Sequence, residues 1–471
     1  MRTVQVNRSL TRHAAPLRVA AIPAVVVPLM ALCSCAEYLP NPLAERIDLR
    51  DRPALMMVTP ADVPLPVLRS HRFDLRRPLD MDEVATLAVV ANPDLRAARA
   101  RLGVTQAQSF AAGILPNPQL TVDYGFFTGG PGTNDGYAIG LAQDVLPLLT
   151  LSARKAAAKR DVAAVSLELL WQEWQVVSQA RTLYVQRASL EQQRAILAGS
   201  RALFAGRYQT SNAAMMKGDE ILPVVAADLV SLSAIETQTN DVEQLILRNK
   251  HDLNALLGLK PDAPLRLAGL SLSSRLDGRR LTPRLADLAA HRPDILALKL
   301  GYGAEEERVR QTIIEQFPKL SIGTSRAKDT TAVFTQTLSV SLTLPVFDRN
   351  QGNIAIEAAT RERLKLEYQA RLNASYAASA RLVTEIALAE GQLRAAGSRT
   401  ANLQTALDQS QAAFKAGNLD GRTYADLETS LVTSKLTAAK LRQVILEQRV
   451  ALQTLVGSEL PNSAVSAARV L

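Results

Sequence analysis

The sequence predicts a mainly α-helical fold with a smaller β contribution, built from one unit that occurs twice. Two markers show the duplication. Asn92-Pro93-Asp94 is echoed about 200 residues later by Arg292-Pro293-Asp294, and Pro118-Gln119-Leu120 by Pro318-Lys319-Leu320. Each copy also contains alternating apolar residues and a proline-free segment of about sixty residues. Alternation indicates strands, and a long segment without proline indicates a helix. The repeated unit is therefore helix, β-hairpin, long helix, helix.

The N-terminal segment has the composition of a secretion signal. Residues 1–34 contain four arginines and no acidic residue, and Val19–Ala31 is apolar but too short to span a membrane. The segment leads into Leu32-Cys33-Ser34-Cys35, which resembles a bacterial lipoprotein signal, so we expect Cys35 to be lipidated. An ordinary secretion signal with two incidental cysteines is the alternative. The chain has 2 cysteines, and removal of residues 1–34 would leave only Cys35, so we expect no disulfide and no cysteine-based metal site in the mature protein.

Charge and hydropathy argue against a nucleic-acid-binding protein and against a protein with transmembrane helices. The formal net charge of +9 includes the four arginines of residues 1–34. The remaining excess is scattered among acidic residues, which gives no nucleic-acid footprint. No apolar run of the length of a transmembrane helix follows the signal. If the mature chain spans a membrane, it must do so with strands.

The repeat divides the rest of the chain. Residues 35–80 are rich in proline and have no periodicity, which predicts an extended tether. We expect repeat 1 at residues 81–258, a linker at 259–283, repeat 2 at 284–457 and a flexible tail at 458–471. A helix is expected from about 81 to 114, and Asn92-Pro93 is a candidate break within it.

Each repeat contains one predicted hairpin. The strands are expected at about 119–128 and 137–146, and at about 319–327 and 333–344. The last strand alternates most regularly, with leucine and valine on one face and serine and threonine on the other. Strands of about ten residues suit a tilted crossing of a bilayer. Four strands cannot close a barrel, so this interpretation requires other subunits. Two half-buried hairpins of a soluble sheet are the alternative.

A very long helix is expected after each hairpin, from about Thr150 to Thr210 and from about Gly352 to Ala416. Sixty helical residues extend about 90 Å, a length that implies coiled-coil-like packing or a bundle. The chain is expected to reverse near Tyr208–Gly218 and at Ala416-Gly417-Asn418, and the return helices to end near Leu257 and Leu455.

Five motifs in this order give the sequence a family likeness. They are Leu115-Pro116-Asn117-Pro118-Gln119-Leu120, Arg292-Pro293-Asp294-Ile295, Phe317-Pro318-Lys319-Leu320-Ser321-Ile322-Gly323, Leu344-Pro345-Val346-Phe347-Asp348-Arg349-Asn350-Gln351-Gly352 and Gly417-Asn418-Leu419-Asp420. Together with the duplication, they resemble the TolC-type outer-membrane factor family, the exit ducts of tripartite efflux and type I secretion systems. The resemblance covers roughly residues 80–457, and a lipidated Cys35 matches the efflux-lipoprotein branch.

The resemblance implies a homotrimer in which twelve strands from three subunits close one transmembrane β-barrel, above a periplasmic α-helical tunnel. It implies a lipid-anchored protein of the bacterial outer membrane that extends into the periplasm. Its partners would be outer-membrane lipid, a periplasmic adaptor (membrane fusion) protein and an inner-membrane pump. The implied function is passive conduction of substrates to the exterior, or alternatively the duct of a type I secretion system.

The family bears acidic residues that ring a periplasmic gate at the second helix reversal. The matching region here offers Asp420 and Asp426, with Arg422 and Tyr424 as partners. The family often has a second acid where this chain has Thr423, which puts the cation sensitivity of the gate in question. A solvated acid in the first turn of a helix is the alternative for Asp426. The first reversal matches the family poorly and is assigned no role.

No residues predict catalysis, a metal site or a cofactor. The four histidines are scattered, and neither a nucleophile elbow nor a phosphate loop occurs. We therefore expect no enzyme. A lipid-tethered periplasmic coiled-coil scaffold, with small soluble hairpins, is the rival interpretation. The sequence names neither the cargo nor the adaptor nor the class of pump.

Overall fold

The computed structural model describes residues 38–53, 65, 68, 77–126, 128, 134–269 and 288–457. The chain divides into two units, Met1–Asp48 and Leu49–Leu471, and every helix and strand described below belongs to the second. The predicted signal at 1–34, Cys35, residues 270–283 of the predicted linker and the tail at 458–471 lie outside the described residues.

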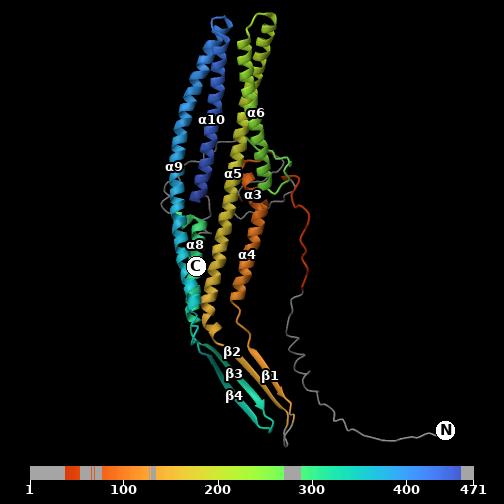
Figure 1. Cartoon of the computed structure of the whole chain (residues 1–471), viewed down its shortest axis with the longest axis vertical. Coiled ribbons are helices and arrows are strands. Elements are labelled where there is room, and N and C mark those ends of the chain that lie inside the picture. The colour runs from red at the N-terminus through yellow and green to blue at the C-terminus, as the bar shows by residue number, and fades with distance from the viewer. Residues whose placement is uncertain are drawn as a thin grey trace, which may run out of the picture. The chain divides into compact units, whose positions relative to one another are not determined.

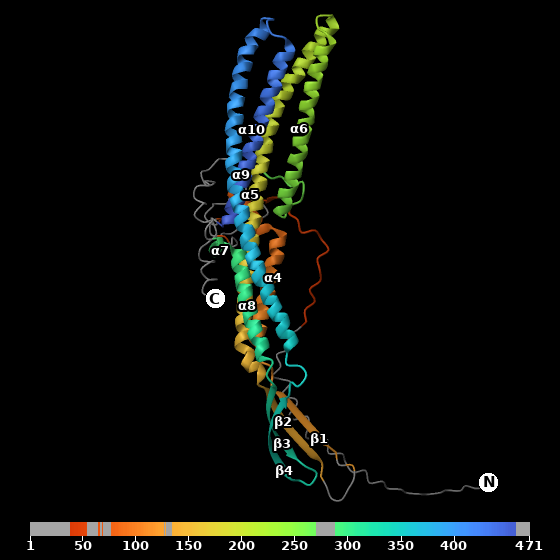
Figure 2. The ribbon, with the colours of Figure 1, turned by 60° about the vertical axis from the view of Figure 1, so that its left-hand side comes forward.

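Two copies of one unit follow each other along the chain, which confirms the predicted fold class (Figure 1). The first copy contains α3 (Met81–Ala91), α4 (Pro93–Ala112), β1 (Gln119–Gly125), β2 (Gly136–Asp144), α5 (Leu146–Lys217) and α6 (Leu222–Leu256). The second contains α7 (Leu288–His291), α8 (Pro293–Ile314), β3 (Lys319–Lys328), β4 (Phe334–Thr343), α9 (Gln351–Lys415) and α10 (Gly421–Val456). Figure 2 shows the same ribbon turned by 60° about the vertical axis.

The first helix is broken at the predicted place. Asn92 ends α3 and caps α4, and its side-chain oxygen accepts a hydrogen bond from the Leu95 amide at 3.0 Å. Its amide nitrogen donates to the Leu256 carbonyl at 3.1 Å, which ties this break to the end of the return helix. Pro93 takes the first helical position, where its missing N–H is not needed. Pro293 begins α8 in the same way.

The first long helix extends beyond its predicted limits at both ends. It spans 72 residues, begins at Leu146 before Pro147 and ends at Lys217. Pro147 is tolerated because it lies in the first turn. The reversal expected near Tyr208–Gly218 occurs at the last residue of that range, because neither glycine nor proline interrupts residues 208–217 and Gly218 takes the left-handed conformation.

The four strands form one antiparallel sheet in the order β1-β2-β3-β4, so the hairpins of the two repeats join through β2 and β3. Opposite residues of paired strands share a face. The register places twelve large apolar or aromatic residues on one face, here called the apolar face: Leu120, Val122, Tyr124, Tyr137, Ile139, Leu141, Leu320, Ile322, Phe334, Leu338, Val340 and Leu342. The other face, here called the small-residue face, carries mainly glycine, alanine, serine and threonine.

The largest core lies where α3, α5, the end of α6 and the linker meet. Trp174 is 2 % exposed there, and its indole N–H donates to the Thr454 carbonyl of α10 at 3.1 Å. The tether expected at 35–80 contributes to this core, since Leu65, Leu68 and Leu79 are buried in it. At these points the segment is packed rather than extended into solvent.

The helix reversals lie at the end of the helices opposite the sheet (Figure 1). Helix α5 packs against α6, α8 and α10, and α9 packs against α8 and α10. Among the described residues, no helix combines the length and the apolar character needed to cross a membrane.

Candidate gate at the helix reversals

Both reversals are closed by the same backbone device. At the first, the Gly218 N–H donates to the Met215 carbonyl at 3.0 Å and the Asp219 N–H to Ala214 at 2.9 Å. At the second, the Gly417 N–H donates to Phe414 at 3.0 Å and the Asn418 N–H to Ala413 at 2.9 Å. Gly218 and Gly417 have φ values of 83° and 75°, which favour glycine. The sequence therefore specifies two tight helix ends.

Asp420, the first predicted gate acid, begins α10. Its carboxylate accepts hydrogen bonds from the Thr423 amide at 2.8 Å and the Thr423 hydroxyl at 2.6 Å. These bonds hold the pKa of Asp420 below its ordinary value. Thr423, which stands where the family often has an acid, thus completes the cap of this helix. Asp420 is the N-cap of α10 in this chain.

The other three predicted residues are placed differently. Tyr424 stacks on Phe414 across the reversal, with ring centroids 4.8 Å apart and planes 7° apart. Its hydroxyl donates a hydrogen bond to the Glu428 carboxylate. Burial is the larger cause that raises the pKa of Tyr424, and the negative charge of Glu428 is the next. Asp426 and Arg422 are exposed, and within the described residues neither side chain has a hydrogen-bond or ion-pair partner. The structure therefore brings Tyr424 into a cluster and leaves Asp426 facing outward.

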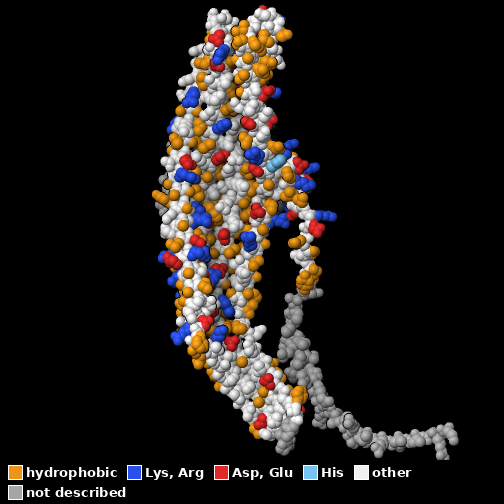
Figure 3. Space-filling view, viewed as in Figure 1, with side chains coloured by type: hydrophobic (Ala, Val, Ile, Leu, Met, Phe, Trp, Pro, Cys, Tyr) orange, Lys and Arg blue, Asp and Glu red, His pale blue; other side chains and the backbone are white. Residues whose placement is uncertain are grey.

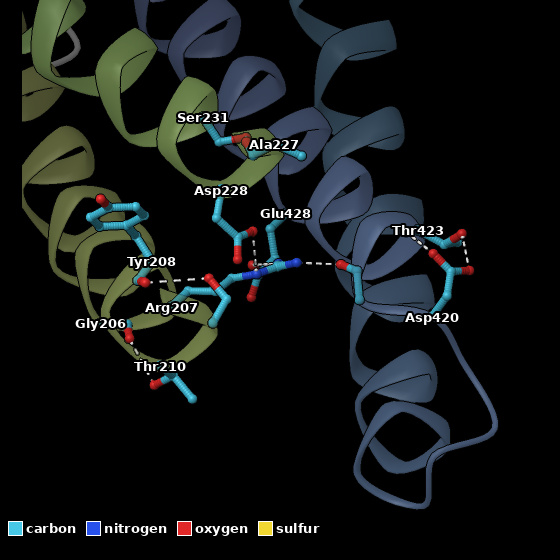
Figure 4. Close-up of polar contacts among 12 residues, drawn as sticks. Gly206, Arg207, Tyr208, Thr210, Ala227, Asp228, Ser231, Asp420, Thr423 and Glu428 are labelled. Carbon is cyan, nitrogen blue, oxygen red and sulfur yellow. Dashed lines mark hydrogen bonds and ion pairs between the residues drawn. The ribbon is translucent and has the colours of Figure 1, made fainter. Parts of the chain in front are cut away.

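An arginine that the sequence did not single out joins the two reversals. Arg207 of α5 lies between Asp228 of α6 and Glu428 of α10 (Figure 4). Its Nε is 3.0 Å from Asp228 Oδ1, its Nη1 is 3.3 Å from Glu428 Oε2, and its Nη2 donates to the carbonyl of Gly421. One guanidinium thus connects three helices from both repeats. We call Arg207, Asp228, Tyr424 and Glu428 the reversal cluster.

The reversal cluster is buried. The side chains of Asp228 and Glu428 are 3 % and 4 % exposed, and that of Arg207 is 16 % exposed. Burial raises the pKa of Glu428 despite the neighbouring guanidinium. Two acids share one cation, so the guanidinium compensates both, and its removal would leave two buried carboxylates unpaired. Arg207 therefore holds α5, α6 and α10 together at the reversal cluster.

No signal in the sequence separates Arg207, Asp228 and Glu428 from other charged residues of long helices. They lie on three helices, and Arg207 and Glu428 are 221 positions apart. Phe204 lies three residues before Arg207 on α5 and is 1 % exposed, so this part of the helix has a buried face. The partners across it follow only from the packing of α5 against α6 and α10.

The described residues contain no group of three His, Cys, Asp or Glu side chains placed as metal ligands would be. The polar residues at the reversals are ion pairs, caps and hydrogen bonds. Their arrangement can hold helix ends together or release them, and it shows no paired groups placed for acid–base chemistry.

The family model of the outer membrane efflux proteins matches residues 285–458, a range that nearly coincides with the predicted repeat 2 at 284–457. No sequence relative is found among curated proteins.

Solved structures cover nearly the whole chain. CusC, whose structures concern transmembrane channel formation, has a TM-score of 0.66 at 18 % identity, over 86 % of this chain and 98 % of its own. The outer membrane protein VceC of Vibrio cholerae has a TM-score of 0.68 at 18 % identity, over 80 % of this chain and 96 % of its own. The outer membrane channel CmeC of Campylobacter jejuni has a TM-score of 0.67 at 13 % identity, over 92 % and 96 %.

At these identities the structures establish the fold, and the family model adds a sequence match over repeat 2. The predicted resemblance to the TolC-type outer-membrane factors is thus confirmed: the chain has the fold of outer-membrane efflux channels, and residues 285–458 match the family model of the outer membrane efflux proteins.

Proposed function

We propose that the chain is one subunit of a trimeric outer-membrane duct of a tripartite efflux system. The duct passively conducts substrates from a periplasmic adaptor and an inner-membrane transporter to the exterior. The observation that carries this proposal is the four-stranded sheet, which has one exposed apolar face and two edges that pair with no other described strand. In water the apolar face of such a sheet is exposed to solvent, and in lipid the backbone groups of its edge strands are unpaired.

The apolar face supports a position in the membrane. Val122 is 66 %, Leu338 is 76 % and Val340 is 65 % exposed, and no helix covers them in the described chain. A contiguous exposed apolar surface of this kind marks a protein or membrane interface. The small-residue face, with Ser339, Ser341 and their neighbours, suits the polar interior of a barrel.

The sheet edges support the trimer. Among the described strands, β1 pairs only with β2 and β4 only with β3. Unpaired backbone groups in lipid cost several kcal/mol each, so the edges must pair with those of other copies. Three copies give the twelve-stranded barrel that the family resemblance implies.

The first reversal supports adaptor docking. Met216, Ile221 and Leu222 are 79 %, 64 % and 67 % exposed at the end of the α5–α6 hairpin. Figure 3 shows hydrophobic side chains gathered over this end of the molecule. An apolar patch at the end away from the sheet suits an adaptor in the periplasm. The first reversal, whose sequence matches the family poorly, would thus be the end of the subunit that contacts the adaptor.

The candidate gate residues fit this arrangement. Asp426 and Arg422 are exposed on α10 close to the reversal, where neighbouring subunits would meet. Asp420 and Tyr424 hold the helix end behind them. We propose that Asp426 and Arg422 seal the closed gate between subunits, while the reversal cluster joins the two helical hairpins, α5–α6 and α9–α10, within each subunit. No covalent chemistry is required.

Lipidation of Cys35 would anchor each subunit at the membrane. The proposal rests on the Leu32-Cys33-Ser34-Cys35 sequence. Replacing Cys35 by Ala separates the duct from the rival scaffold. A duct remains embedded and needs detergent for extraction, whereas a scaffold held only by its acyl chains is released into the soluble fraction.

The conducting role is tested in planar bilayers with purified protein. We expect trimers of low conductance, and a higher conductance for Asp426→Ala because one seal of the gate is removed. Asp241→Ala, which removes an exposed acid of α6 away from the reversal, is the matched control and should conduct like the unaltered chain. Absence of both trimers and conductance in Asp426→Ala contradicts the proposal.

A further inference from the structure

Two basic residues, Arg326 and Lys328, lie on the apolar face at the hairpin end of the sheet. The register aligns Tyr124, Tyr137, Lys328 and Phe334 in one row across all four strands, at the hairpin end of the sheet. Arg326 lies in the next row, beside Ile139 and Gln336. Lys328 and Arg326 therefore project from the same face as the apolar residues, among aromatic side chains.

Neither cation has an ionic partner in the described chain. Arg326 is exposed and lies over the Phe334 ring, with its guanidinium carbon 5.7 Å from the centroid. Two acids lie close to this end of the sheet, Asp329 directly after β3 and Asp135 directly before β2, and both accept hydrogen bonds from other residues. Asp329 accepts bonds from the Thr331 amide, the Thr331 hydroxyl and the Val333 amide.

The other nearby acid, Asp135, accepts the hydroxyl of Tyr124 at 3.0 Å. Residues 129–133 of the first hairpin contain no acidic residue. The cations thus remain available to an anion from outside the chain.

The position of the pair matches a membrane boundary. Leu320 and Lys328 lie on the same face, eight residues apart on β3, which is roughly 27 Å along the strand. The apolar band of a transmembrane barrel is about 25 Å tall and is bordered by aromatic residues. A strand tilted by about 35–45° spreads this length over roughly 20 Å of bilayer. The aromatic and basic row therefore lies near the border of the apolar band that is opposite the end of the sheet that meets the helices.

We propose that Arg326 and Lys328 bind the phosphate groups of a phosphorylated glycolipid in the outer leaflet. The inference rests on the proposed function, which places the apolar face in lipid and the hairpin end outward. Two cations on alternate residues of one strand lie about 7 Å apart, so one headgroup can reach both. Guanidinium and ammonium groups are the usual phosphate ligands. Each trimer would carry three such sites, one on each subunit.

The test compares lipid binding by native mass spectrometry of the detergent-solubilised full chain. The probes are lipid A, dephosphorylated lipid A, phosphatidylcholine and inorganic phosphate. The variant is Arg326→Gln with Lys328→Gln. The matched control is Lys319→Gln with Arg349→Gln, which removes two exposed cations near the helix end of the sheet.

We expect the variant to bind lipid A about thirty-fold more weakly than the unaltered chain, the combined effect of two cations at an anionic lipid surface. The control should keep its affinity, and dephosphorylated lipid A should bind the unaltered chain no better than phosphatidylcholine does. Equal lipid A binding by variant and control overturns the inference. So does full competition by millimolar inorganic phosphate, since the site would then recognise the free ion.

Trimer mass and conductance are recorded on the same samples. If all variants form conducting trimers and bind lipid A equally, the glycolipid site is wrong and the proposed function stands. If the unaltered chain forms neither trimers nor channels, the proposed function is wrong, whatever lipid is retained.

Discussion

Replacing Arg207 by Met tests the reversal cluster most sharply. Methionine keeps a long unbranched side chain and removes the charge and every hydrogen bond. The substitution breaks the 3.0 Å contact with Asp228, the 3.3 Å contact with Glu428 and the bond to the Gly421 carbonyl. The two helical hairpins of one subunit, α5–α6 and α9–α10, then lose the contacts of Arg207 that connect them at the reversals.

The expected loss follows from burial. Both carboxylates are at most 4 % exposed, and removing one partner of a buried ion pair costs about 3–5 kcal/mol. Burial already raises the pKa of Glu428, so this group can take up a proton and reduce the loss toward the lower figure. A change of about 3 kcal/mol shifts an equilibrium between joined and separated hairpins by roughly a hundred-fold.

The assay is open-channel conductance of the purified trimer in planar bilayers at pH 7. The matched control is Arg201→Met, on the same helix, which removes an exposed pair with Glu236 at 3.1 Å. Exposed pairs contribute about 0–1 kcal/mol, so this control should conduct like the unaltered chain. Adding Glu428→Gln to Arg207→Met removes one of the orphaned charges and should restore part of the closed state.

Two results would refute the reasoning. The first is an Arg207→Met trimer that is folded and conducts no more than Arg201→Met. The second is a double variant that opens further than Arg207→Met alone, because relief of an unpaired buried charge must favour the joined state.

Two further predictions concern the helices near the sheet and the sheet itself. A hydrogen bond to Glu305, and then burial, raise the pKa of Glu357 from 4.5 to about 6, so its stabilising contribution is complete below pH 4.5 and is lost as the pH rises through 6. Melting temperatures should therefore fall between pH 4.5 and 6 in the unaltered chain, and less so in Glu357→Gln; equal pH profiles would show that the two acids do not share a proton. At Gly323, a Cβ atom would lie 2.8 Å from Ser339 Oγ and 3.0 Å from the Leu141 carbonyl, so Gly323→Ala should lower trimer heat stability by about 1–3 kcal/mol. Gly301 has open space around it, and Gly301→Ala should be neutral or stabilising by up to about 1 kcal/mol; a Gly323→Ala trimer as heat-stable as Gly301→Ala would contradict the close packing.

Local chemistry made much of the fold predictable. The break at Asn92-Pro93 could be predicted because proline restricts the preceding residue and suits a helix start. The strands could be recognised because apolar residues alternate, most regularly in β4. The end of α5 was predicted at about Thr210, but the helix continues through residues 211–217, which contain neither glycine nor proline. Glycine stops this helix only at Gly218, where the backbone requires a positive φ.

The candidate site was less predictable. Asp420 and Tyr424 could be found because they follow a recognisable reversal. Arg207 could not, because its partners lie on α6 and α10 and become neighbours only through helix packing. The row of Tyr137, Lys328 and Phe334 had the same difficulty, since strand register decides which side chains share a face.

The central claim is that β1 and β4 of neighbouring subunits pair to close a barrel. Hydrogen exchange of the outward amides of β1 and β4, in lipid nanodiscs, tests it most directly. If the barrel is closed, these amides exchange as slowly as those of β2 and β3, which are paired within the chain. Fast exchange along both edge strands, with β2 and β3 protected, would contradict the account.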